Sequence, residues 1–223
     1  MSISVIVPTY NEEKNIEVFL QQLLQHKFNE IIIVDGGSSD QTRQLAKKHT
    51  DKIYISSKGR AAQMNFGASR AQGTVFLFLH ADTFLPSDAK QEILNGITIS
   101  KCGKFRDSFE PSNTCLRFYA FFTRFQYFSY GDQAFFMHRQ CFDSINGFDE
   151  NHPFEDIDFY KRLRKIHKPY ISLKSVRTSS RRFIKVGVIK QAMIDFLFIL
   201  MIEFSIPHKH IKKVKKYLYS DIR

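Results

Sequence analysis

The residues best suited to chemistry follow an unbroken apolar run, where His80 and Asp82 come after residues 75–79. Such a run is typical of a strand that is buried on both faces in the middle of a parallel sheet. In open α/β sheets, ligands bind in the crevice beyond the carboxyl ends of the strands. Carboxylate and imidazole groups at that edge can hold a divalent cation. The pattern therefore indicates an enzyme that handles a phosphorylated ligand.

Two earlier turns bring more polar groups to the same edge. Residues 8–13 follow the first apolar run and open a helix, with Asn11 as its cap and Glu12 suited to the positive end of the helix dipole. Alternatively, Glu12 accepts hydrogen bonds from a base or ribose. Asp35 closes the second strand, and its carboxylate suits the imide N–H of uracil or a ribose hydroxyl. A tight turn and a helix cap would explain every other residue of the 34–40 segment.

A third turn carries a cation. Arg60 stands at the start of a predicted helix over Ala61 to Ala71, where a guanidinium group and unpaired backbone donors together make a cradle for a diphosphate. Gln63 lies on the same side of that helix. The alternative is an ordinary amphipathic helix.

The elements that must position these groups alternate between strands and helices. The apolar patterns predict strands at 3–7, 31–34, 52–55 and 75–79, and helices at 12–25, 40–48 and 61–71. This alternation predicts right-handed βαβ units in a mostly parallel sheet flanked by helices, which is an α/β fold.

The pattern becomes mixed after Pro86. We expect helices at 87–96 and 154–166, an edge or antiparallel strand at 101–109, an irregular aromatic segment at 114–130 and a strand at 134–138. A long helix is predicted over 182–206, stopped by Pro207 and followed by a basic tail. Since there is no internal repeat or linker, we expect one domain over residues 1–223.

Four motifs in this order resemble glycosyltransferase family 2. They are Val-Ile-Val-Pro-Thr-Tyr-Asn-Glu-Glu at 5–13, Ile-Val-Asp-Gly-Gly-Ser-Ser-Asp at 33–40, Gly-Arg-Ala-Ala-Gln-Met-Asn-Phe-Gly-Ala at 59–68 and His-Ala-Asp at 80–82. Within the family the chain resembles the bacterial radical-SAM/selenodomain-associated transferases, over about residues 1–190. The resemblance implies a GT-A (Rossmann-like) fold, a UDP- or GDP-linked sugar donor, Mn²⁺ or Mg²⁺, and inversion at the anomeric carbon.

The resemblance also implies roles for donor-side residues. Those that would line the nucleoside pocket are Pro8, Tyr10, Glu12 and Asp35, with Arg60 and Gln63 near the donor. His80 to Asp82 stands where the family has Asp-x-Asp, so Asp82 would bind the metal that bridges the two phosphates. His80 departs from that pattern. It is a metal ligand, a donor to such a ligand or a contact to ribose or phosphate, or it is structural, as a lone histidine at a strand end often is.

The later motifs are assigned in the same way. The acids of the 154–158 segment suit the start of a helix, but the segment resembles the family's Glu-Asp motif, which makes Asp156 the general base with Glu155 beside it. Gly131, Asp132 and Gln133 resemble the region that shapes the acceptor side, although Asp132 also suits a turn.

Two late arginines are further candidates for the donor side. Arginines late in family members close over the donor diphosphate, which makes Arg181 and Arg182 candidates. A solvated basic turn would explain both residues equally well.

Charge suggests where the protein acts. Lys and Arg number 33 against 22 Asp and Glu, a net charge of +11, and the basic residues cluster late, at 162–168, 177–185 and 209–216. Without an RNA-binding signature, we predict no nucleic-acid partner. An anionic membrane surface or phosphorylated lipid fits the clusters better, and solvated basic faces are the plain alternative. The aromatic segment 118–136 either packs in the core or forms an apolar groove for a lipid acceptor.

The cellular setting follows from three observations. Three cysteines, Cys102, Cys115 and Cys141, show no zinc or disulfide spacing. The N-terminal segment lacks the layout of a signal peptide. The apolar run 192–206 is interrupted by acids and is shorter than the roughly 20 residues of a membrane span. We expect a cytoplasmic protein, peripheral at the inner face of the membrane.

These expectations combine into one hypothesis with two rivals. The hypothesis is a single-domain, inverting, metal-dependent glycosyltransferase, with a donor-binding half at 1–85, an acceptor and catalytic half at 86–180, and a C-terminal helix and basic tail at 181–223. One rival is a nucleotidyltransferase, which should carry a glycine-rich phosphate loop where this chain has Pro8 to Asn11. The other is a non-catalytic module that binds nucleotide-sugars or a membrane surface.

Overall fold

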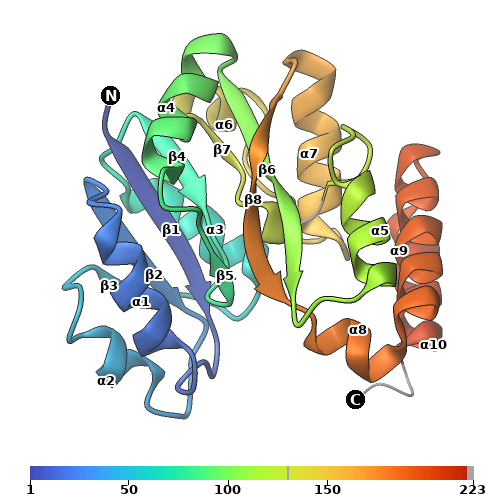
Figure 1. Cartoon of the computed structure of the whole chain (residues 1–223), viewed down its shortest axis with the longest axis horizontal. Helices are drawn as coiled ribbons and strands as arrows, with labels where there is room; N and C mark the ends of the chain where they lie inside the picture. Colours follow the sequence, from blue (N-terminus) through green and yellow to red (C-terminus); the bar gives the residue numbers. More distant parts are fainter. Residues whose placement is uncertain (130, 220–223) are drawn as a thin grey trace.

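The structure is a computed structural model that describes residues 1–129 and 131–219. In these residues eight strands form one sheet, in the order β3-β2-β1-β4-β7-β6-β8-β5 (Figure 1). The strands are β1 (Ile3–Thr9), β2 (Glu30–Asp35), β3 (Ile53–Ile55), β4 (Val75–Phe78), β5 (Thr83–Phe84), β6 (Cys102–Glu110), β7 (Phe136–His138) and β8 (Tyr170–Ser179). Only β5 and β7 among these run against the others, so the predicted mostly parallel α/β sheet is confirmed.

Helices flank the sheet, and three of those described follow its last strand in the sequence, β8. They are α1 (Ile16–Gln25), α2 (Thr42–Ala46), α3 (Arg60–Arg70), α4 (Ala89–Ile99), α5 (Thr114–Phe122), the 3₁₀ helix η1 (Gly131–Gln133), α6 (Arg139–Ser144), α7 (Glu155–Ile166), α8 (Arg181–Val186), α9 (Val188–Glu203) and α10 (His208–Leu218). None of the helices in the described residues is both long and apolar enough to cross a membrane.

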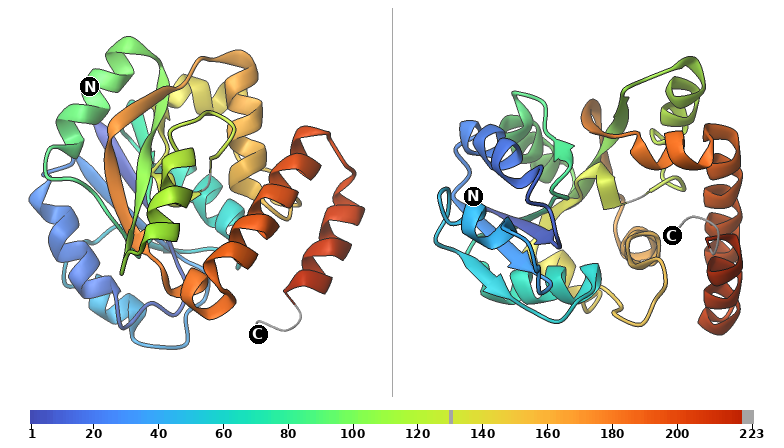
Figure 2. Two further views of the ribbon diagram at one scale, coloured as in Figure 1. Left: turned by 45° about the vertical axis from the view of Figure 1, so that its right-hand side comes forward. Right: turned by 90° about the horizontal axis from the view of Figure 1, so that it is seen from below.

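Alternation along the buried strands sorts side chains into two cores. Val5 and Leu77 point to a core shared with α1, α2 and α4, whereas Ile6 and Phe76 point to a core shared with α3, α6 and α7 (Figure 2). Because both faces are covered, these strands read as continuous apolar runs. In the C-terminal part of the chain, α7 packs against α9, which also contacts α5 and α10.

The first half of the chain follows its predicted elements closely, and the second half departs from them. The segment 114–130, predicted to be irregular, contains the helix α5. The last residue of that segment, Tyr130, lies outside the described residues. The predicted strand at 101–109 is β6; it is antiparallel to β7, but it lies inside the sheet rather than at an edge. Strands β5 and β8 and helix α6 were not predicted.

The C-terminal helices correct another expectation. The single helix predicted over 182–206 is wrong, because Gly187 adopts φ 92° and separates α8 from α9. A positive φ of this kind is open to glycine and costly for other residues. The expected basic tail is the helix α10.

Candidate functional site

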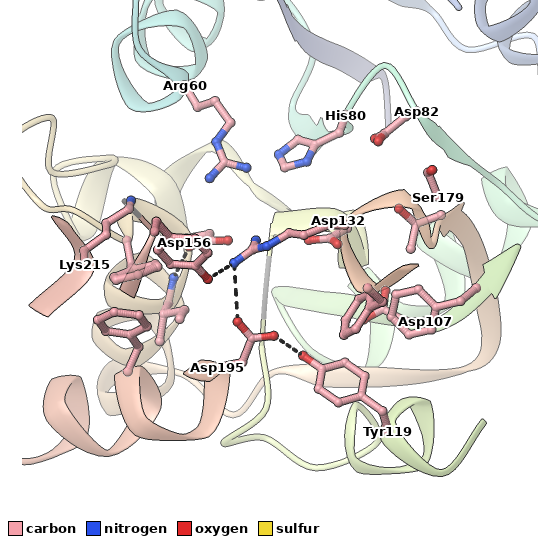
Figure 3. Close-up of a pocket in the computed structure, with 18 residues that line it drawn as sticks. Arg60, His80, Asp82, Asp107, Tyr119, Asp132, Asp156, Ser179, Asp195 and Lys215 are labelled. Atoms are coloured by element: carbon pink, nitrogen blue, oxygen red, sulfur yellow. Dashed lines mark hydrogen bonds and ion pairs between the residues drawn. The ribbon is translucent and has the colours of Figure 1, made fainter. Parts of the chain in front are cut away.

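One cavity of about 420 Å³ lies at the carboxyl ends of the parallel strands. Its walls come from the ends of β6 and β8, the turn after β4, η1, and residues near the starts of α3 and α7, with α8, α9 and α10 on the far side (Figure 3). This is where the sequence predicted a ligand crevice. Carboxylates dominate the polar walls; they are Asp82, Asp107, Asp132, Asp156 and Asp195.

Six predicted site residues line this cavity together. They are Arg60, His80, Asp82, Asp132, Asp156 and Arg182. They come from five separate segments of the chain. Convergence of groups this far apart in sequence on one cavity is the arrangement expected of a binding site.

Close packing of α3 on the sheet positions Arg60. Gly67 faces β1, and a Cβ atom there would lie only 2.5 Å from the Ile6 side chain, so the helix approaches the sheet more closely than a larger residue would allow. The helix start therefore lies at the carboxyl edge of the sheet. There Arg60 Nε lies 2.7 Å from Glu155 Oε1. Glu155 itself does not line the cavity.

The start of α7 positions Asp156. The residue is 7% exposed and lines the cavity, and its Oδ1 accepts a hydrogen bond from the Ile157 backbone N–H at 2.9 Å. A carboxylate in the first turn of a helix is favoured by the helix dipole. The side chain is thus held at the cavity.

Crowding of carboxylates changes the acidity of the site. Burial raises the pKa of Asp132, His80 opposes this, and the charges of Asp156 and Asp82 raise it further. Burial likewise raises the pKa of Asp107 to about 8, with a further contribution from Asp132. Burial thus favours the neutral forms of these two carboxyl groups, and a cation in the cavity would favour their ionised forms.

A second polar cluster closes the cavity on the side of α9. Burial raises the pKa of Asp195 to about 6, against the lowering effect of Arg182. Asp195 accepts a hydrogen bond from the Tyr119 hydroxyl at 3.0 Å and lies 3.5 Å from Arg182 (Figure 3). Lys215 enters from α10, and burial lowers its pKa.

Sequence reasoning missed several of these groups. The missed cavity residues include Asp107, Tyr119, Ser179, Asp195 and Lys215. One signal was present in the sequence: Gln191 and Asp195 stand four residues apart in an otherwise apolar segment, and their side chains hydrogen-bond at 2.7 Å inside the protein. Polar pairs inside an apolar helix need a partner or a ligand.

Asp35 does not line the cavity. It is fully buried, and its carboxylate accepts hydrogen bonds from the backbone N–H groups of Gly37 at 3.0 Å and Ser38 at 2.8 Å. Asp35 therefore stabilises the turn after β2. The sequence predicts that role for the other residues of the 34–40 segment.

Two glutamines expected at the site make buried hydrogen bonds within the protein. Gln63 is 3% exposed, and its side-chain N–H₂ group donates to the carbonyls of Thr9 and Val34, at 2.7 Å each, which ties β1 to β2. Both amide hydrogens of Gln63 are thus used within the protein, and its expected contact with the donor stays a prediction.

Gln133 is likewise buried. Its Oε1 accepts from Lys104 Nζ at 2.9 Å, and its Nε2 donates to Asp107 at 3.0 Å. The amide therefore supports Asp107 in the cavity wall, and its part in shaping the acceptor side stays a prediction. Gly131 opens η1 just before Asp132.

The remaining predicted residues do not line the cavity. Pro8 is buried in β1, and Glu12 accepts from the Asn15 side chain at 2.8 Å. Tyr10 is half exposed, with Lys58 Nζ 3.9 Å from its ring centre. Arg181 lines a neighbouring pocket of about 270 Å³ that Asp82 also borders.

The donor set suits a hard divalent cation. In residues 1–129 and 131–219, no three His, Cys, Asp or Glu side chains gather closely enough to form a complete metal site. Mg²⁺ and Mn²⁺ need no such cage, since one or two carboxylates and the substrate phosphates commonly complete their shell. Asp82, with His80 or Asp132 in the same cavity wall, fits that mode.

The chain is similar in sequence to known transferases. The model of the family described as glycosyl transferase family 2 matches residues 4–148. Poly(ribitol-phosphate) beta-N-acetylglucosaminyltransferase TarS of Staphylococcus aureus is 32% identical over 103 residues, which is 41% of this chain and 18% of that protein. Dolichol-phosphate mannosyltransferase of Pyrococcus furiosus is 32% identical over 106 residues, 44% of this chain and 30% of the relative. The chain thus spans under a third of the length of these curated relatives.

Solved structures agree on the fold. S. aureus TarS 1–349 in complex with UDP-GlcNAc superposes with a TM-score of 0.66 at 20% identity, over 88% of this chain and 67% of that one. The mannosyltransferase PcManGT from Pyrobaculum calidifontis, in complex with GDP-Man and Mn²⁺, gives a TM-score of 0.62 at 18% identity, over 87% and 64% of the two chains. These likenesses establish the GT-A fold.

Proposed function

The chain belongs to glycosyl transferase family 2, and from that premise we propose that it is a glycosyltransferase, which carries out a metal-dependent, inverting transfer of a sugar from a UDP- or GDP-linked donor to a hydroxyl acceptor. The observation that carries this proposal is the single cavity lined by Arg60, Asp82 and Asp156. A cation for phosphate, a carboxylate for metal and a second carboxylate for a proton are the groups such a transfer requires.

The donor diphosphate would lie between Arg60 and Asp82. Arg60 offers a guanidinium group beside the start of α3, where backbone N–H groups favour anions. Asp82, with His80 or Asp132, would hold Mn²⁺ or Mg²⁺, which when bound supplies positive charge against the departing nucleotide. Arg182 extends the positive charge from α8.

Asp156 would act as the general base. The acceptor oxygen forms a bond to the anomeric carbon while the bond from that carbon to the phosphate oxygen breaks, and the hydroxyl proton passes to Asp156. Attack opposite the leaving group inverts the anomeric configuration, so the protein needs no covalent nucleophile. Glu155 would orient Arg60 through their ion pair.

The two rivals fare differently. A nucleotidyltransferase is disfavoured by membership of this family and by the Pro8 to Asn11 turn. A non-catalytic binding module keeps every contact described above, so only an assay of turnover separates it from the enzyme.

A screen of nucleotide-sugars tests the proposal. Thermal unfolding would be followed with UDP- and GDP-linked sugars, each with and without Mn²⁺ or Mg²⁺, and released nucleotide would be measured by chromatography. We expect one donor class to raise the melting temperature, by more when metal is present, because ligands that prefer the folded state stabilise it. Donor binding without metal-dependent release of nucleotide would favour the non-catalytic module, and no shift with any donor would contradict the proposal.

We further propose that α10 brings the enzyme to the inner, anionic face of the cytoplasmic membrane. From Phe204 to Tyr219 every charged side chain is basic, and Lys209, Lys212 and Lys213 are exposed. Basic segments bind anionic bilayers at about 1 kcal/mol per residue near the surface. Vesicle sedimentation tests this: binding to phosphatidylglycerol vesicles that equals binding to phosphatidylcholine vesicles would contradict it.

Two finer assignments belong with this proposal. The motif residues favour the bacterial radical-SAM/selenodomain-associated subgroup. The chain would act as one domain over residues 1–223, in which residues 1–85 bind the donor, 86–180 carry the acceptor and catalytic side, and the remainder closes the cavity.

A further inference from the structure

A second hollow lies outside the cavity, between α5 and α9. It measures about 680 Å³, and its walls are almost wholly aromatic and aliphatic. Its larger side chains are Phe118, Phe122, Phe128, Ile189, Met193 and Phe196. This groove has room for a hydrocarbon chain, and its walls offer almost no polar partner.

Helix α9 explains why the groove is apolar. Ile194, Phe198 and Ile202 pack inward, as expected for a helix on a core. The opposite side is apolar too: Ile189 is 70% exposed and Met193 68% exposed. A helix that is hydrophobic on all sides is normally covered on all sides, and a contiguous apolar patch of this kind marks a binding surface.

The apolar patch continues onto neighbouring elements. Phe118 of α5 is 68% exposed, and Phe121, Phe125 and Phe204 are also exposed. Figure 2 shows α5 and α9 side by side at the edge of the molecule, away from the N-terminal strands. The patch therefore forms one face rather than scattered positions.

The groove meets the cavity at Tyr119. The Tyr119 side chain lines both hollows, and its hydroxyl donates to Asp195, which lines the cavity only. A molecule that fills the groove therefore ends next to Tyr119 and Asp195, at the wall of the cavity. An acceptor with an apolar chain and a polar head would match both hollows at once.

The helices around the groove carry exposed positive charge. The exposed charged side chains of α5, α8 and α9 are all basic: Arg117, Arg181, Arg182, Lys185 and Lys190. Two copies of this chain paired symmetrically through the face would bring these like charges together, which is unfavourable. Anionic lipid head groups would instead be attracted.

We propose that the groove binds the hydrocarbon chain of an anionic membrane lipid, whose head group reaches the cavity past Tyr119 as the acceptor. The acceptor class rests on the function proposed above, whereas the lipid site rests on the groove itself. The hydrocarbon chain contributes burial of apolar surface, and the basic side chains of α5, α8, α9 and α10 attract the anionic head group.

A fluorescent fatty acid tests the site directly. Saturable binding of cis-parinaric acid would be measured for the parent protein, for Ala192→Trp, which fills the groove, and for Met193→Glu, which places a charge on its wall. Ile99→Glu is the matched control, because Ile99 is an equally exposed apolar residue (72%) on α4, far from the groove. We expect affinity about tenfold weaker in both groove variants and unchanged in the control.

The donor screen, run on the same proteins, separates the two levels of the proposal. Loss of parinaric acid binding in the groove variants, with the donor shift retained, supports the site and its place beside a working cavity. Equal binding in all four proteins, or no saturable binding by the parent, overturns the inference even if donors bind. Groove binding without any donor shift overturns the acceptor assignment and the proposed function, and leaves a lipid site. A dimer that Met193→Glu dissociates, without parinaric acid binding, would assign the face to a second copy.

Discussion

Replacing Asp156 by asparagine is the sharpest test of the catalytic assignment. Asparagine keeps the shape of the side chain and an oxygen that can accept the Ile157 N–H bond of 2.9 Å, but it cannot take a proton from the acceptor. Removal of a positioned general base typically costs 10²- to 10⁴-fold in rate, or about 2.7 to 5.4 kcal/mol of transition-state stabilisation. We therefore expect transfer to fall by at least about 100-fold.

Folding and donor binding should survive this change. Because the helix contact is retained, we expect the melting temperature to stay within about 3 °C of the parent. The donor shift should persist or grow, since a negative charge is removed near a diphosphate. Transfer would be measured with saturating donor and metal, by chromatography of the released nucleotide.

The neighbouring Glu155→Gln is the matched control. It removes a carboxylate from the same helical turn, but the lost partner is Arg60, whose side chain is 49% exposed. An ion pair screened to that extent is worth about 0.5 to 1 kcal/mol, so transfer should fall by no more than about fivefold. The reasoning is refuted if Asp156→Asn retains transfer within tenfold of the parent, or if Glu155→Gln is the more damaging change.

Three further substitutions test the metal-binding role of Asp82, the raised pKa of Asp107 and the buried hydrogen bonds of Gln63. Asp82→Asn should abolish the metal-dependent part of the donor shift while leaving a metal-free shift; an undiminished response to Mn²⁺ would contradict this. Burial raises the pKa of Asp107 from 3.8 to about 8, so ionisation weakens the fold as pH rises through that interval; Asp107→Asn should gain stability over the parent between pH 5 and pH 8 in urea titrations. Lys104, whose pKa burial lowers to about 7, titrates in both proteins, and a difference that shrinks with pH would count against this assignment. Gln63→Leu should lower the free energy of unfolding by about 2 kcal/mol, because two carbonyls lose a buried donor, and should leave the donor shift intact; a lost shift at normal stability would support its predicted donor role.

The N-terminal half was predictable because its signals are local. Each strand from β1 to β4 is a short apolar run, and Gly36, Gly37 and Gly59 mark the turns after β2 and β3. Parallel strands bring their carboxyl ends to one edge, so Arg60 and Asp82 were placed correctly from neighbouring residues alone. Asp35 shares that edge but turns inward, which depends on the φ of Gly37 and was not visible in residue types.

The second half depended on distant contacts. Buried and exposed side chains alternate only weakly along β8, and several of them are exposed. The strand is stabilised by its long pairing with β6. The break at Gly187 looked like a minor interruption in a helical pattern. Asp195 and Lys215 reach the cavity only because α9 and α10 fold back over it, and no local pattern encodes that return.

Both arginines of the cavity wall already have anionic neighbours: Glu155 for Arg60, and Asp195 for Arg182. An incoming anion must therefore share each guanidinium group with a resident carboxylate, so it gains less than it would from a bare cation. Singly charged anions such as chloride or acetate offer little advantage over the resident partners. A diphosphate accompanied by its own metal offers several oxygens and more charge, so the site should ignore common cellular anions and respond to nucleotide diphosphates.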